Sequence, residues 1–127
     1  MQTREIPRDQ WVSFLDGFSR QHEGWLSSIE VTQDGQRDKI EARDLPLVGI
    51  AASIKHGDKD TMDIILGKGT ENFTHNLSGV KHIRLQQNDR GEDAGLEFDA
   101  SDGSKAVLTF RTPASPASVD DVSRARR

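Results

Sequence analysis

PRDQWVSFLDGFSRQHEG, residues 7–24, has the pattern of one amphipathic helix. Pro7 suits the first helical position, where a missing N–H costs nothing, and Gly24 suits a left-handed C-terminal cap. Large side chains recur between them at helical spacing, on one stripe that comprises Trp11, Phe14, Leu15, Phe18 and His22. The helix is therefore expected to begin at Pro7, to end by Gly24 and to cover a hydrophobic face.

From Trp25 onward the apolar residues alternate with polar ones, which predicts β-strands. The dipeptides Asp34-Gly35 and Asp102-Gly103 predict hairpin turns. Pro46 cannot donate to a β-ladder, so it is expected to separate a strand with Ile40 and Ala42 facing inward from a later strand through residues 50–54.

Short turns between successive strands favour antiparallel neighbours, because a parallel crossover needs a dozen or more residues. Each strand has only one apolar face, and the helix stripe is its natural cover. The predicted fold class is α+β, with the N-terminal helix packed on a curled antiparallel meander of about six or seven strands. An open curled sheet and a partly closed barrel both fit the pattern.

The apolar pattern covers residues 1–111, which predicts a single domain. The composition then changes to TPASPASVDDVSRARR, residues 112–127, which is rich in Pro, Ser and Ala and has little to bury. This C-terminal tail is predicted to be disordered.

The chain of 127 residues has a formal net charge of −4 and no cysteine. Its 17 basic residues are interleaved with 21 acidic ones, which argues against nucleic-acid binding. The N-terminus lacks the apolar core of a secretory signal, and no segment approaches the ~20 apolar residues of a membrane span. We therefore expect a cytoplasmic protein with no membrane partner.

Four histidines raise the question of a metal site: His22, His56, His75 and His82. Their spacing matches no zinc motif, so no metal ligand or cofactor is predicted. His22 ends the helix stripe and His75 lies on an inward face, so the two could meet at one end of the sheet with Glu23 or Glu41 nearby.

The candidate binding residues are thus His22, Glu23, Trp25 and His75. The alternative is structural, with His22 complementing the helix dipole, His75 hydrogen-bonded at the edge of the core and Trp25 packed inside it.

Five segments carry a family resemblance: REIPRDQWVSFLDGFSRQHEGWLSSIEV at 4–31, EARDLPLVGI at 41–50, THNL at 74–77, VKHIRL at 80–85 and LEFDASDGSKAVLTFR at 96–111. Together they resemble one bacterial family of uncharacterised proteins, domain of unknown function 5335. The resemblance covers almost everything before the tail and implies one coherent domain. The family name implies no activity, substrate or catalytic residue.

No group of residues suggests a reaction. Gly67-Lys68-Gly69-Thr70 lacks the earlier glycine of a phosphate-binding loop and is interpreted as a turn. No catalytic residue is predicted. The leading hypothesis is a non-enzymatic module that binds a protein partner, or a second copy of itself, through its sheet or helix surface. The alternative is a small-ligand or metal-binding domain that uses His22 and His75.

Overall fold

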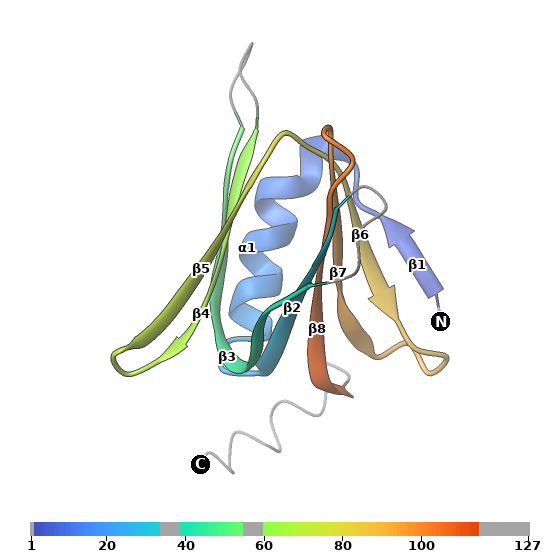
Figure 1. Ribbon diagram of the computed structural model, residues 1–127. Helices are drawn as coiled ribbons and strands as arrows, with labels where there is room; N and C mark the ends of the chain where they lie inside the picture. Colours follow the sequence, from blue (N-terminus) through green and yellow to red (C-terminus); the bar gives the residue numbers. More distant parts are fainter. Residues whose placement is uncertain (1, 34–38, 55–59, 115–127) are drawn as a thin grey trace.

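Eight strands and one α-helix form the part of the chain that the computed structural model describes, residues 2–33, 39–54 and 60–114. The strands are β1 (Gln2–Glu5), β2 (Leu26–Thr32), β3 (Lys39–Ser53), β4 (Thr61–Lys68), β5 (Glu71–Ser78), β6 (Val80–Gln87), β7 (Asp93–Ala100) and β8 (Lys105–Ala114). The helix α1 (Trp11–Gln21) follows a 3-10 turn, η1 (Arg8–Gln10). The strands form one antiparallel sheet that curls beside α1 (Figure 1), which confirms the predicted α+β class.

The sheet contains two meanders rather than the single one expected. Its order is β1-β6-β7-β8-β2-β3-β4-β5, so β2–β5 and β6–β8 are joined where β8 pairs with β2. The chain passes from one meander to the other at Gly79, whose φ of 72° is in the left-handed region. The strand number is eight rather than six or seven, partly because β1 is entirely polar and exposed and gives no apolar alternation.

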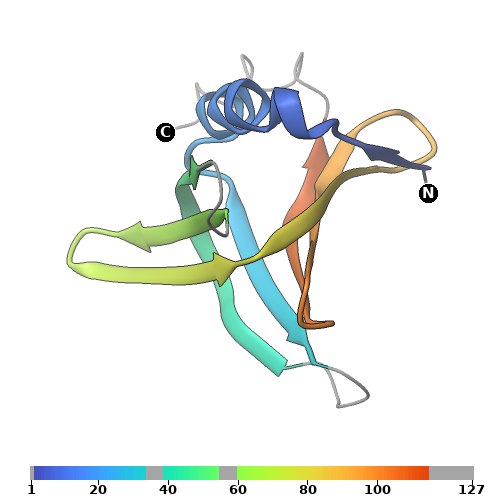
Figure 2. The ribbon, with the colours of Figure 1, turned by 90° about the horizontal axis from the view of Figure 1, so that it is seen from above.

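The sheet is open, so of the two alternatives the structure has the open curled sheet and not the partly closed barrel. The strands β1 and β5 are its two ends, and within the described ranges they do not pair with each other. Figure 2 shows the reason for the gap: the β4–β5 hairpin extends away from the rest of the sheet, on the side opposite β1.

The helix stripe was predicted correctly. Trp11, Leu15, Phe18 and His22 are buried, and Phe14 packs against the core, whereas Val12 on the other side is 55% exposed. The α-helix begins at Trp11 rather than at Pro7, because residues 8–10 form the tighter 3-10 turn. Gly24 adopts the expected left-handed φ of 87°, but the C-cap of the helix is His22, and the N–H of Gly24 donates to Leu47 of β3 instead of to a helix carbonyl. No helix in the described part of the chain has the length and apolar character needed to cross a membrane.

β3 runs through Pro46 instead of stopping there. The strand changes direction at Asp44, which has a φ of 51°, and Pro46 still pairs with Leu26 of β2. Ile40 is 47% exposed rather than inward, because the register with β2 shifts by one residue between Ile40 and Ala42. A one-residue shift turns a side chain to the other face of a sheet.

Of the two hairpin turns expected, Asp102-Gly103 lies between β7 and β8, with a φ of 92° at Gly103. Asp34-Gly35, like His56, lies outside the described residues. The strand β8 continues past residue 111 to Ala114, and the remainder of the predicted tail also lies outside the described residues.

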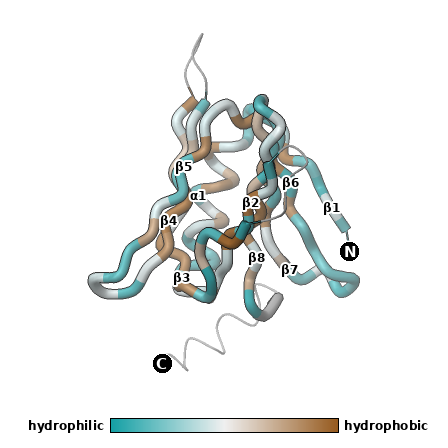
Figure 3. Tube along the Cα trace, viewed as in Figure 1, coloured by the Kyte–Doolittle hydropathy of each residue, from teal (hydrophilic) through white to brown (hydrophobic). Residues whose placement is uncertain are grey.

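One hydrophobic core lies between α1 and the inner face of the sheet. Figure 3 shows hydrophobic residues along the helix and the middle of the strands, and hydrophilic residues toward the hairpin ends. The most fully buried side chains are Ile6, Trp11, Leu15, Ile29, Leu47, Met62, Ile64, Leu66, Ile83, Leu96, Phe98 and Leu108.

Gly95 of β7 is required by a close backbone approach, whereas Gly17 of α1 is not. A Cβ on Gly95 would overlap the carbonyl oxygen of Leu108, but a Cβ on Gly17 would meet no atom within 4 Å. We expect Gly95→Ala to destabilise the fold by about 3 kcal/mol, and Gly17→Ala to stabilise it by up to about 1 kcal/mol. Urea denaturation of both variants tests this, and equal effects of the two substitutions would contradict it.

Candidate functional site

The predicted corner at the end of α1 is built around His22, which is completely buried. Its ring contacts the rings of Phe18 and Phe110, with centroid distances of 4.2 and 4.9 Å, and these two rings also stack on each other at 5.7 Å. Trp25 meets the same ring edge-on at 4.4 Å. Three aromatic rings therefore enclose the imidazole.

Both ring nitrogens of His22 face hydrogen-bond acceptors. Nδ1 lies 2.8 Å from the carbonyl oxygen of Phe18, and Nε2 lies 3.0 Å from Oδ2 of Asp93. A carbonyl oxygen only accepts, so Nδ1 carries a hydrogen. When the carboxylate of Asp93 is ionised it also only accepts, and Nε2 of His22 donates to it.

Asp93, at the start of β7, is only 7% exposed and is ionised. Burial alone would raise the pKa of its carboxyl group, but hydrogen bonds from His22 and Gln87, with the positive charges of His22 and Arg4, hold that pKa below its ordinary value. Gln87 donates to Oδ1 from 3.0 Å. His22 and Asp93 thus form a buried hydrogen-bonded pair in which each side-chain nitrogen and oxygen has a partner.

Irregular pairing of β7 with both of its neighbouring strands determines where the side chain of Asp93 lies. The register of β6 with β7 shifts between Gln86 and Gln87, and the register of β7 with β8 shifts between Asp93 and Gly95. Such bulges redirect side chains. Asp93 was missed in the sequence because it lies 71 positions from His22, next to a polar loop with no spacing that connects them.

The remaining predicted residues of this corner differ in exposure. Trp25 is partly buried and packs on His22 and on Phe110, whose ring centroid is 5.0 Å away. Glu23 is exposed. The backbone between them is fixed, because Gly24 donates to the carbonyl of Leu47 and Leu47 donates to that of Trp25.

His75 lies elsewhere, in the middle of β5. It faces Ile64 of β4 and its ring stacks with Phe73 at a centroid distance of 6.5 Å. Burial lowers the pKa of His75, and the negative charge of Glu41 opposes this shift only in part. Within the described residues no hydrogen bond or ring contact joins His22 to His75, and no three potential metal ligands lie together.

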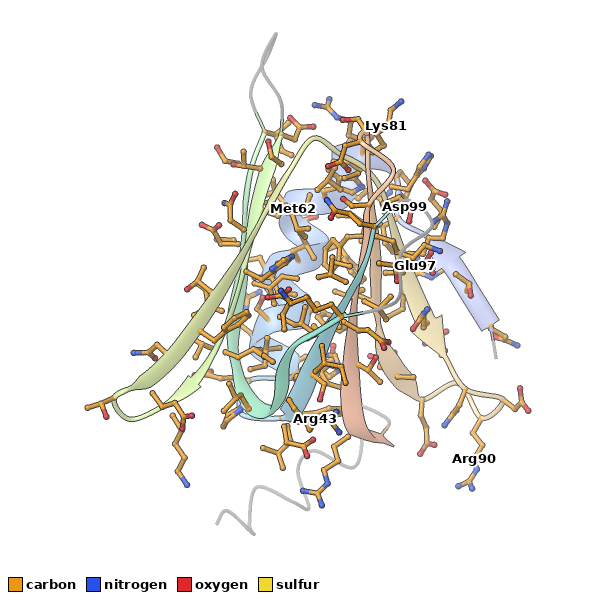
Figure 4. The ribbon with its side chains drawn as sticks, viewed as in Figure 1. Arg43, Met62, Lys81, Arg90, Glu97 and Asp99 are labelled. Carbon is orange, nitrogen blue, oxygen red and sulfur yellow. The ribbon has the colours of Figure 1, made fainter. Side chains whose placement is uncertain are left out.

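A charged network covers the outer face of β1, β6, β7 and β8. Arg84 lies 2.5 Å from Asp99, Lys105 lies 3.0 Å from Glu97, and His82 lies 2.6 Å from Glu5. Figure 4 shows Glu97 and Asp99 close together on this side of the molecule. Opposite charges neutralise one another across these strands, so the network fits a solvated, structural surface.

The free edge of β5 differs from the free edge of β1. β5 pairs with β4 over eight residue pairs without a register shift, contains no proline and carries one charged residue, Glu71. β1 has four residues, of which Arg4 and Glu5 are charged. Natural edge strands are protected by short length, charge, proline or bulges, and β5 has almost none of these features.

Comparisons with known proteins agree with the resemblance seen in the sequence. An uncharacterised protein of Aquifex aeolicus (strain VF5) is 26% identical over 116 residues, which cover 91% of this chain and 97% of the relative. No solved structure matches the chain. The family described as a family of unknown function, DUF5335, matches residues 2–119, nearly the whole chain. The protein therefore belongs to this family.

Proposed function

We propose that the protein is a non-enzymatic interaction module of the bacterial cytoplasm, which binds an extended segment of a protein partner along the free edge of β5. The observation that carries this proposal is the length and regularity of an edge strand with almost no protection. Addition of a strand to such an edge is a common mode of peptide recognition.

The direction of the backbone groups on β5 follows from its hairpin. Gly69, with a φ of 63°, and Thr70 form a two-residue turn, so Lys68 and Glu71 face each other as a hydrogen-bonded pair. At the other end of the hairpin the N–H of Gly79 donates to the carbonyl of Asp60. This bond fits the same alternation of hydrogen-bonded and non-hydrogen-bonded pairs along β5.

Odd-numbered residues of β5 therefore direct their N–H and C=O groups toward β4. The alternate residues Asn72, Thr74 and Asn76 direct theirs to the free side, where an added strand would bind. Their side chains are exposed and lie on the outer face of the sheet. A partner strand gains main-chain hydrogen bonds here without displacing any from the β4–β5 ladder.

The geometry gives less support to a ligand or metal site at His22 and His75. Every nitrogen and oxygen of the His22–Asp93 pair already has a hydrogen-bond partner inside the protein. A ligand would have to displace these bonds from a buried position, at a cost of roughly 1–3 kcal/mol for each polar group left without a partner.

Thr74→Pro tests the proposed edge. Proline removes the N–H that points to the free side and leaves the bonds to β4 intact, so partner binding should fall at least about tenfold, or about 1.4 kcal/mol. Thr74→Ala keeps the N–H and is the matched control. Tagged full-length protein would be compared as wild type and as both variants in extracts of the source cells.

A partner retained by the wild type and Thr74→Ala but lost by Thr74→Pro supports the proposal. Equal retention by all three proteins, with unchanged melting temperatures, would show that the partner binds another surface.

A further inference from the structure

The central segment of β5, Phe73 to Leu77, has the same chemical pattern in both directions. An apolar residue stands at each end, a small polar residue follows each of these, and His75 is in the middle. Two identical antiparallel strands related by a twofold axis need this kind of self-complementarity, because each residue meets its counterpart from the opposite direction.

We propose that the partner of the β5 edge is the β5 edge of a second copy of this chain, paired antiparallel with His75 opposite His75 on the twofold axis. This inference rests on the function proposed above, since it names the occupant of the same edge. Phe73 of each copy then faces Leu77 of the other, and Thr74 faces Asn76.

Other registers fit less well. A shift by one residue turns the inner face of one copy toward the outer face of the other. A shift that places Thr74 on the axis puts the charge of Glu71 opposite Leu77. The opposite shift, with Asn76 on the axis, puts Phe73 opposite Gly79. Cross-strand apolar pairs stabilise a sheet, so the register centred on His75 is favoured.

The environment of His75 is compatible with this register. Its backbone groups point toward β4, so His75 and its counterpart form a non-hydrogen-bonded pair, in which Cα atoms approach to about 4.5 Å. Burial lowers the pKa of His75, so the two rings are neutral at neutral pH and do not repel each other. Phe73 and His75 are both only partly buried within one copy, and the pairing would cover them further.

Because the chain contains no cysteine, single substitutions can report the register. Under mild oxidation, His75→Cys should form a covalent dimer, since the expected Cα separation lies within the ~4.4–6.8 Å range of disulfides. Thr74→Cys and Asn76→Cys place no thiol opposite its own copy and should remain unlinked. Cross-linking at position 74 or 76 in place of 75 would overturn the proposed register.

Sedimentation of the full-length protein separates this inference from the proposed function. The wild type and Thr74→Ala should dimerise with rising concentration, and Thr74→Pro should remain a monomer. A wild type that stays monomeric at millimolar concentration would overturn self-pairing, while the edge could still bind another protein in the extract experiment. A Thr74→Pro variant that dimerises as well as the wild type would place the dimer interface elsewhere and overturn the inference.

Discussion

Replacement of Trp11 by alanine should lower the free energy of unfolding by about 3–5 kcal/mol, the range found for large aromatic residues removed from a core. Trp11 begins α1 and is 1% exposed. Its indole N–H donates to the carbonyl of Ile6 from 2.9 Å, and Ile6 donates its own N–H to the carbonyl of Ile83 in β6. The side chain thus fills the core and also connects the start of the helix, through Ile6, to β6 of the β6–β8 meander.

Trp11→Phe separates the packing of the ring from its hydrogen bond, and Val12→Ala is an exposed control. Trp11→Phe keeps an aromatic ring but loses the hydrogen bond, and should cost less than Trp11→Ala. Val12→Ala changes a side chain that is 55% exposed and should have an effect within about 0.5 kcal/mol. Urea denaturation followed by circular dichroism would measure all three, because this signal does not depend on Trp11 being present. A Trp11→Ala protein within about 1 kcal/mol of the wild type would contradict the prediction.

Asp93→Ala should destabilise the protein by about 1–3 kcal/mol, because it leaves the buried Nε2 of His22 without its hydrogen-bond partner. Asp93→Asn keeps the shape and an acceptor oxygen and should have a smaller effect. Gln87→Ala removes only the second hydrogen bond to the carboxylate, so a loss of about 1 kcal/mol is expected.

The hydrogen bonds to Asp93 also predict how stability changes with pH. The pKa of Asp93 is lower in the folded protein than in the unfolded chain, so the unfolded chain binds more protons in acid. The contribution of the Asp93 carboxylate to the free energy of unfolding is therefore complete above the ordinary pKa of an aspartate. It is lost as the pH falls through the lowered pKa of Asp93. Asp93→Asn should show a flatter decline in acid.

Local patterns in the sequence were sufficient for the helix and for most strands. The stripe from Trp11 to Phe18 and the alternation in β4 and β5 depend on residues close together in the chain, so periodicity identifies them. β1 was missed because its side chains are all polar and exposed, and it exists only because β6 offers a ladder. The exposed position of Ile40 depends on a bulge, which no alternation can indicate.

The candidate site was also predicted in part, again where the residues lie close together in the chain. The grouping of His22 with Trp25 follows from their closeness at the end of a helix, and the structure brings them into contact. The hydrogen-bond partner of His22, Asp93, comes from β7, in the β6–β8 meander. The position of Asp93 depends on the overall topology, which local patterns do not reveal. For the same reason His22 and His75, which were predicted to lie close together, make no hydrogen bond or ring contact with each other among the described residues.

The joining of the two meanders by β2 and β8 has a consequence for how the chain folds. Each meander is made of hairpins between successive strands, which form by closing short loops. The β2–β8 ladder, in which Ser27 faces Phe110, requires closure of a loop of roughly 80 residues and should form late. During synthesis β2 leaves the ribosome roughly 80 residues before its partner, so the nascent chain carries an open strand edge until β8 emerges.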